Sequence, residues 1–330
     1  MQRFTGLEYL KIDIANQYGL DKSIWEHRIR WVDNNITQLE QYTNMADKPI
    51  LYIKAVQALR DTEAGIPTGF IMGLDSTASG LQIMAVATGC HTTAANVNLV
   101  NTGQREDIYE KVSNTMNQLP GVAVTRNIIK KPLMTTFYGS KAKPKQIFGE
   151  DTRELRAFYT TLMTELPGAF QLLGDIQTFW NPMALEHKWS LPDGHVVHAK
   201  VLVSVDKKIE VDELDHATFT FRTTANQPSE FGLSLAANII HSIDAFVVRE
   251  MIRRCNDRGV QLATIHDCFY ACPNDMDIVR LIYICIMAEL ARSDIMQNIL
   301  REISGNSTYK FTKLTDNLDE AIIKSEYALS

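Results

Sequence analysis

The chain has 330 residues, of which 45% are hydrophobic and 22% are charged, and its formal net charge is −6. This length can bury a large core or form two lobes around a cleft. The sequence shows no signal peptide and no apolar run long enough to span a bilayer, so we expect an intracellular protein with no membrane association. The acidic balance argues against nucleic-acid binding over the whole surface.

The cysteines exclude two further classes of protein. Five are present, and an odd number in so long a chain predicts free thiols and not a disulfide framework. Cys268 and Cys272 have no plausible further ligands nearby, which argues against a structural zinc site.

The first part of the chain is predicted to be mainly helical. Residues 6–60 indicate helices joined by polar loops, and residues 104–118 and 150–190 also indicate helices. The exception is the short apolar run Phe70–Leu74, which is typical of a buried strand and ends at Asp75.

The second part of the chain mixes strands with long helices. Residues 195–224 alternate between apolar and polar side chains and predict a β-hairpin arm. Residues 230–254 predict an amphipathic helix whose apolar side includes Leu233. Residues 263–272 predict a tight hairpin with Asp267 near its turn. The whole pattern predicts an α+β fold, mostly helical with a small antiparallel sheet.

A basic helix is predicted over residues 125–139, although Pro132 is expected to kink it or to mark a new start. Arg126 and Lys130 are four residues apart and therefore share one helical face, and Tyr138 follows about two turns later. Such a helix can hold a triphosphate on its cations and place the tyrosine near a base and sugar. Taken alone, the same spacing also fits an ordinary surface helix with a buried aromatic end.

Two aspartates, Asp75 and Asp267, end or flank the predicted short strands. Either one alone is more often a turn or cap residue. Phosphoryl transfer needs in-line positioning and neutralisation of charge, and two divalent ions held by carboxylates about 4 Å apart supply both. Two carboxylates together with the basic helix therefore predict a nucleotidyl-transfer site.

In this order the motifs resemble those of the single-subunit RNA polymerase family of T-odd phages and mitochondria. Phe70–Val86 resembles motif A of that family, Arg126–Lys141 resembles motif B and Ala263–Pro273 resembles motif C. Gly6–Asn16 resembles the segment upstream of motif A, and Phe231–Arg254 resembles the helix that carries a histidine near the substrate ribose. The resemblance covers nearly the whole chain.

The resemblance implies a right-hand polymerase palm and fingers, two Mg²⁺ ions and a defined set of site residues. The implied metal ligands are Asp75, Asp267 and the backbone carbonyl of Ser76. The implied catalytic residues are Asp75, Asp267, Lys130 and Tyr138. The implied substrate-binding residues are Lys11, Arg126, Lys131, Gly80, Gly139 and His241.

Three positions favour RNA synthesis over DNA synthesis. The related DNA polymerases carry a glutamate five residues after the first aspartate, where this chain has Gly80, and an aromatic residue where it has Met134. His241 can hydrogen-bond the 2′-hydroxyl that distinguishes RNA from DNA. A DNA polymerase or primase-type enzyme is the alternative, and a non-catalytic subunit of a transcription complex is a second one.

By resemblance, residues 1–91 form the first part of the palm, with an insertion over about 1–66. Residues 92–241 form the fingers, including the arm at about 195–224, and residues 242–330 form the second part of the palm with a C-terminal foot. The chain begins inside the palm of its relatives. It therefore resembles the larger, catalytic subunit of a split, heterodimeric phage RNA polymerase, and we expect a second subunit to supply the N-terminal domain and thumb.

The expected partners are a DNA template, the RNA product and nucleoside triphosphates. The arm corresponds to the family's promoter-reading hairpin, but it is less basic than a groove reader should be. A promoter-recruitment factor is therefore an additional expected partner. The expected location is the cytoplasm of a phage-infected bacterial cell.

Overall fold

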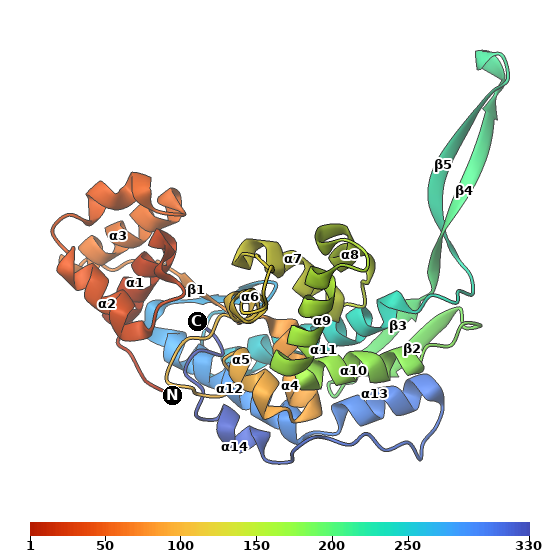
Figure 1. The fold of residues 1–330 in the computed structure, drawn as a ribbon. Helices are drawn as coiled ribbons and strands as arrows, with labels where there is room; N and C mark the ends of the chain where they lie inside the picture. The colour runs from red at the N-terminus through yellow and green to blue at the C-terminus, as the bar shows by residue number, and fades with distance from the viewer.

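The computed structural model describes the backbone of residues 1–330 and every side chain except that of Leu233, so the placement of Leu233 on the apolar side of its helix lies outside the described residues. The predicted α+β class is confirmed. Many helices surround one small antiparallel sheet, and a long two-stranded ribbon projects from the body (Figure 1).

The small sheet has the strand order β1-β7-β6, formed by β1 (Met72–Asp75), β6 (Ala263–Ile265) and β7 (Cys268–Ala271). Its register pairs Leu74 with Phe269 and Asp75 with Cys268. Leu74 and Phe269 are buried in the main core, which fixes the register because a slip by one residue would turn them to the opposite face.

Three helices pack behind this sheet and form the centre of the main core: α4 (Ser79–Thr88), α11 (Leu233–Asn256) and α12 (Met276–Arg292). Gln82 of α4 is fully buried, and its amide donates to the carbonyls of Val97 and Ala328. The hydroxyl of Tyr283 on α12 donates to the Gln82 amide oxygen at 2.5 Å. These bonds lock α4, which follows Asp75, to the helices beneath it.

The N-terminal helices form a lobe with a second small core. They are α1 (Gly6–Ala15), η1 (Asn16–Leu20), α2 (Trp25–Asn34), η2 (Leu39–Met45) and α3 (Pro49–Glu63). Ile14, Val32 and Leu59 are buried in this second core. Arg28 is fully buried and donates to Asn16 and to the carbonyls of Ser23 and Asp21, so its charge is hydrogen-bonded throughout.

The middle of the chain is helical as predicted, although Pro132 does not end a helix. The elements are α5 (His91–Asn96), α6 (Ile108–Asn117), α7 (Arg126–Phe137), α8 (Ala142–Phe148), α9 (Arg153–Glu165) and α10 (Pro167–Thr178). Pro132 lies inside α7 and is buried. Because proline has no N–H group, it cannot donate the helical hydrogen bond to the carbonyl of Ile128, and Ile128 is an exposed residue.

Two hairpins replace the single arm expected at 195–224. The first pairs β2 (Glu186–Ser190) with β3 (Val196–Lys200), and the second pairs β4 (Leu202–Val211) with β5 (Ala217–Asn226) across the short helix η3 (Asp212–Leu214). The buried Val201 lies between them, and its N–H donates to the Leu185 carbonyl, so the chain changes partner there. The helix expected over 150–190 likewise ends at Thr178, because the following residues join the first hairpin.

The last part of the chain returns to the small sheet through η4 (Pro273–Asp275), α13 (Ile295–Ser304) and α14 (Leu318–Ile322). The backbone N–H of Ser330 donates to the carbonyl of Asp75 at 2.9 Å, and Thr77 donates in the same way to Ala328. The C-terminal residues therefore brace the loop after Asp75. Among the described residues, no helix combines the length and apolar character needed to cross a bilayer.

Candidate active site

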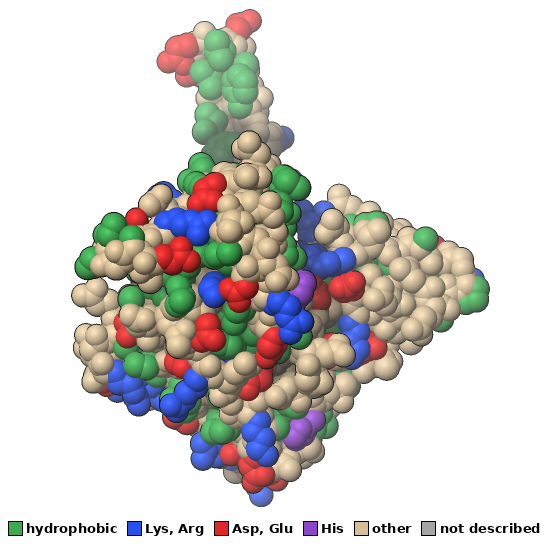
Figure 2. Space-filling view, turned by 90° about the vertical axis from the view of Figure 1, so that its left-hand side faces the viewer, with side chains coloured by type: hydrophobic (Ala, Val, Ile, Leu, Met, Phe, Trp, Pro, Cys, Tyr) green, Lys and Arg blue, Asp and Glu red, His purple; other side chains and the backbone are tan. Residues whose placement is uncertain are grey.

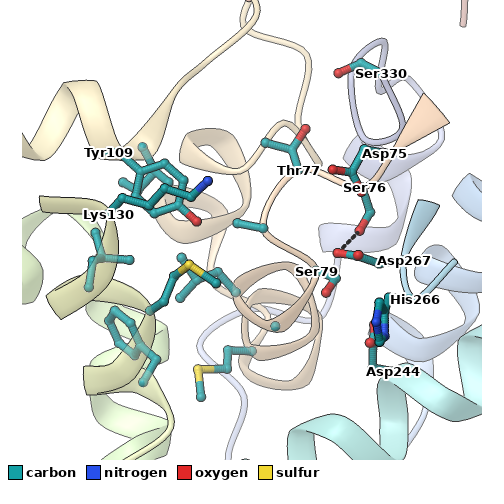
Figure 3. Close-up of a pocket in the computed structure, with 18 of the residues that line it drawn as sticks. Asp75, Ser76, Thr77, Ser79, Tyr109, Lys130, Asp244, His266, Asp267 and Ser330 are labelled. Carbon is teal, nitrogen blue, oxygen red and sulfur yellow. Dashed lines mark hydrogen bonds between the residues drawn. The ribbon is translucent and has the colours of Figure 1, made fainter. Parts of the chain in front are cut away.

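A cavity of about 960 Å³ opens between the small sheet and the helices α6, α7 and α11. Its lining brings together segments that are far apart in the sequence: the loop after β1, the start of α4, the faces of three helices and the β6–β7 turn. Figure 3 shows the carboxylates on one side of this cavity and the side chains of Lys130 and Tyr109 on the other.

Asp75 and Asp267 lie side by side at one end of the small sheet. Asp75 is the last residue of β1 and pairs with Cys268, the residue that follows Asp267. Ser76 joins the two segments, since its N–H donates to the Asp267 carbonyl at 3.1 Å and its hydroxyl donates to the Asp267 carboxylate at 3.0 Å. Asp267 follows His266, whose φ of +54° makes the tight turn between β6 and β7. The backbone therefore fixes both carboxylates at the cavity.

The carboxylates repel each other. Burial in the cleft, followed by the charge of Asp267, raises the pKa of Asp75 to about 6. A divalent cation would relieve this repulsion, and carboxylate oxygens are the protein ligands that Mg²⁺ prefers. The donor set thus fits a hard divalent ion, with the Ser76 backbone between the two aspartates.

A third carboxylate, Asp244 of α11, also lines the cavity and was not predicted from the sequence. Burial and the charge of Asp267 raise its pKa to about 6, although the nearby side chain of Ser79 acts in the opposite direction. Asp244 lies three residues after His241, so the two side chains share one helical face. This three-residue spacing from His241 is the sequence pattern that could have identified Asp244.

The basic helix α7 faces the carboxylates. Arg126 donates to the Asp107 carboxylate at 2.8 Å, and its guanidinium lies 5.4 Å from the ring centre of Tyr109. The ammonium group of Lys130 lies 6.0 Å from the same ring centre. Tyr109 thus holds both cations at the cavity wall through its ring face.

Tyr138, Gly80 and His241 meet at the floor of the cavity. The rings of Tyr138 and His241 are 4.7 Å apart between centroids. A Cβ atom at Gly80 would lie 2.9 Å from the Tyr138 hydroxyl oxygen, closer than side chains tolerate. The absence of a side chain at residue 80 therefore leaves room for the tyrosine hydroxyl, in addition to the room for a ribose expected from the sequence.

Three residues expected to bind substrate do not line the cavity. Lys11 points away and forms an ion pair of 2.5 Å with Asp33 of α2. Lys131 is exposed on another face of α7, because adjacent residues of a helix point in different directions. Gly139 is buried just after α7 with a φ of +93°, so it acts there as the glycine that the turn requires.

Besides Arg249, which forms an ion pair with Asp193, two further basic residues line the cavity that the sequence did not single out, Lys22 and Arg105. Lys22 follows the helical turn η1, and its charge partly opposes the raised pKa of Asp75. Arg105 donates to the Ser330 hydroxyl at 3.2 Å, and burial lowers its pKa. Neither residue lies in a recognisable local motif. Folding of the N-terminal lobe brings Lys22 to the cavity, and the loop before α6 brings Arg105.

A profile of the DNA-dependent RNA polymerase family matches residues 3–147 and 204–328, which is most of the chain. The chain belongs to this family. The matched ranges contain both aspartates, the whole of α7 and the helix that carries His241 and Asp244. They leave out α9, α10 and the β2–β3 hairpin. Members of such a family use divalent metal ions, in agreement with the paired carboxylates.

The relatives in this RNA polymerase family include a phage enzyme and a mitochondrial enzyme. The chain is 23% identical to the DNA-directed RNA polymerase of Pseudomonas phage phiKMV, over 87% of this chain and 44% of the relative. It is 24% identical to the mitochondrial DNA-directed RNA polymerase 1 of Arabidopsis thaliana, over 90% and 36% respectively. A probable DNA-directed RNA polymerase of Neurospora crassa is 22% identical, over 82% and 38%. The chain spans less than half the length of these relatives.

Proposed function

We propose that this chain is the catalytic part of a DNA-directed RNA polymerase, which adds ribonucleotides from nucleoside triphosphates to an RNA 3′-end. The observation that carries the proposal is the placement of Asp75 and Asp267 side by side at a cavity whose opposite wall presents Arg126, Lys130 and Tyr138. Family membership supports the reaction class.

Two Mg²⁺ ions held by Asp75, Asp267 and the Ser76 carbonyl would activate the 3′-hydroxyl and stabilise the leaving pyrophosphate. The protein itself fixes the carboxylates by strand pairing and by the Ser76 hydroxyl, so little reorganisation is needed when substrate arrives. Asp244 adds a third carboxylate to this end of the cavity.

The triphosphate would lie along α7. Lys130 lines the cavity with its ammonium group against the Tyr109 ring face, and phosphate oxygens offer it stronger partners. Arg126 can exchange its Asp107 partner for a phosphate without leaving the helix face. Lys22 and Arg105 add positive charge to the same cavity, whereas Lys11 and Lys131 could reach a nucleotide only after a change in conformation.

The ribose would lie against Gly80, Tyr138 and His241. Gly80 offers no side chain to exclude a 2′-hydroxyl, and His241 offers an imidazole that can hydrogen-bond it. This arrangement supports ribonucleotides as substrates. The alternatives are a DNA polymerase or primase-type enzyme and a non-catalytic subunit. The experiment described below distinguishes them.

The division of the chain into palm (1–91 and 242–330) and fingers (92–241) is part of this proposal. So is a second subunit that supplies the N-terminal domain and thumb, together with a promoter-recruitment factor and a site of action inside a phage-infected bacterium. The similarity to a phage polymerase supports the phage-infected bacterium as the site of action.

The test is nucleotide incorporation on a primed DNA template by the complex purified from its native source. We expect incorporation of ribonucleotides that requires Mg²⁺ and is lost in Asp75→Asn and in Asp267→Asn, with the exposed Asp316→Asn as the matched control. Preferential incorporation of deoxyribonucleotides would instead establish a DNA polymerase. Full activity of both active-site variants would overturn the mechanism.

A further inference from the structure

The β4–β5 hairpin has two chemically different faces. Opposite residues of an antiparallel pair point to the same side, and successive residues alternate. The register pairs Ile209 with Phe219 and Val211 with Ala217 on one face, and Asp206 with Arg222 and Lys208 with Thr220 on the other. The first face also carries Val203, Val205 and Phe221, so it is mainly apolar; its polar members are Lys207, opposite Phe221, and Thr223. The second face is polar except for Leu202.

The apolar face has no partner among the residues that the structure describes. Both strands project away from the body, and green hydrophobic side chains run along the projection (Figures 1 and 2). Ile209, Phe219 and Phe221 are 49%, 51% and 42% exposed. An isolated two-stranded hairpin is only marginally stable in water, and contiguous exposed apolar surface usually marks an interaction site. Something is therefore expected to cover this face.

The charge of the hairpin indicates what covers it. Residues 202–226 contain five acidic and three basic residues, and the acidic ones gather toward the tip, where Figure 2 shows them in red. Arg222 is already held by Asp206 at 2.9 Å, and His216 lies 2.9 Å from Glu210 and 3.3 Å from Asp212. A nucleic-acid backbone would be repelled by this tip, and so would the equally acidic tip of a second copy.

We propose that the apolar face of the β4–β5 hairpin docks a partner protein that presents an apolar surface flanked by basic residues. Phe219 and Phe221 anchor the contact, since large aromatic side chains dominate interface energetics. The acidic tip orients the partner by charge complementarity. This inference deepens the partner part of the function proposed above. Its test uses no nucleotide incorporation, so the two proposals can fail separately.

The first experiment places the photo-crosslinking residue p-benzoylphenylalanine at Phe219 or at Thr220 of the full chain, in the cells that naturally make it. The two positions are neighbours on β5 but face opposite sides. We expect one discrete protein adduct from position 219 and none from position 220. Equal adducts from both positions, no protein adduct from 219, or an adduct from 219 to nucleic acid or to a second copy would each overturn the proposal.

The second experiment purifies the adduct's protein, once identified by mass spectrometry, and measures its affinity for the chain. We expect Phe219→Thr with Phe221→Thr to weaken binding about 30-fold, since each lost anchor costs severalfold in affinity. Threonine keeps the strand propensity, and Thr218→Ala with Thr220→Ala on the polar face is the matched control.

A third variant separates docking from hairpin stability. Glu213→Lys with Asp215→Asn removes two negative charges at the tip and leaves both faces unchanged, and asparagine tolerates the left-handed backbone of residue 215, whose φ is +54°. We expect it to weaken binding of the same protein, and we expect raised salt to weaken binding of the unaltered chain. The proposal would be overturned if the partner protein bound with unchanged affinity to both double variants, the one at residues 219 and 221 and the one at residues 213 and 215.

Discussion

The hydroxyl oxygen of Tyr138 lies 2.9 Å from the point that a Cβ atom would occupy at Gly80. The helix after the first aspartate and the end of the basic helix therefore meet at a residue that has no side chain. This contact couples the position of Tyr138 to the identity of residue 80.

Gly80→Ala should lower the kcat/KM for ribonucleotides about tenfold, because the new methyl group displaces the Tyr138 ring from His241. The double variant Gly80→Ala with Tyr138→Phe removes the clashing oxygen. In the Tyr138→Phe background, the added alanine should therefore cost much less. Steady-state kinetics of all four proteins forms a double-mutant cycle, and strict additivity of the two effects would show that the contact is irrelevant to catalysis.

Lys130→Ala and Lys131→Ala should differ, although the two residues are adjacent. Only Lys130 lines the cavity, so its loss should raise the KM for nucleoside triphosphate by about tenfold or more, as expected for a lost phosphate contact. Lys131→Ala should change KM less than about twofold, because Lys131 lies outside the cavity and solvent screens its charge. Equal effects of the two variants would show that α7 rotates or shifts when substrate binds.

Divalent metal binding should weaken as the solution becomes more acidic. The pKa of Asp75 is about 6 without metal, and the metal binds its ionised form. Below pH 6 the apparent Mg²⁺ affinity should therefore fall by up to about tenfold per pH unit for this group. Titration calorimetry of the purified chain at several pH values measures this apparent Mg²⁺ affinity. Asp75→Asn should show weak binding with a flatter pH dependence.

Asp75→Asn should stabilise the metal-free protein at neutral pH. The folded-state pKa of about 6 lies above the ordinary value of 3.8, so the folded state loses stability as the pH rises from about 4 to 6. The asparagine variant lacks this penalty. Because Asp75 opens onto the solvent-filled cavity, screening limits the gain to an increase in Tm of about 1–2 °C at pH 7.5.

The measurement is thermal unfolding in a chelating buffer. The difference in Tm between Asp75→Asn and the unaltered chain should shrink as the pH approaches 4, where both folded and unfolded carboxyls begin to be protonated. A variant that is less stable at neutral pH, or a difference that grows on acidification, would contradict the repulsion between the two aspartates.

Local patterns were enough to find the centre of the candidate site. The apolar run before Asp75 and the four-residue spacing of Arg126 and Lys130 are properties of single elements, and the structure places all three residues at one cavity. Asp244 could have been found from its spacing to His241. Arg105 could not, since only the packing of distant segments brings it to the cavity.

The sequence pattern did not predict features that depend on contacts between distant segments of the chain. Lys11 and Lys22 each form an ion pair, Lys11 with Asp33 of α2 and Lys22 with Asp21. Only the second pair lies at the cavity, and the sequence does not show this difference. The β-rich composition of residues 195–224 continues through Val201–Val203, so it gives no sign that one strand ends there. Only the burial of Val201 against the body divides the segment into two hairpins.

The projecting hairpin also gives the molecule a predictable first cleavage site. Lys207, Lys208 and Arg222 are exposed on strands that no other element covers, so trypsin should cut there before it reaches the body. The two fragments would stay together under native conditions, because β1 belongs to one and β6 and β7 to the other. A nicked chain would therefore migrate as one species in gel filtration and as two on a denaturing gel. Protection from nicking would report occupancy of the hairpin without any label.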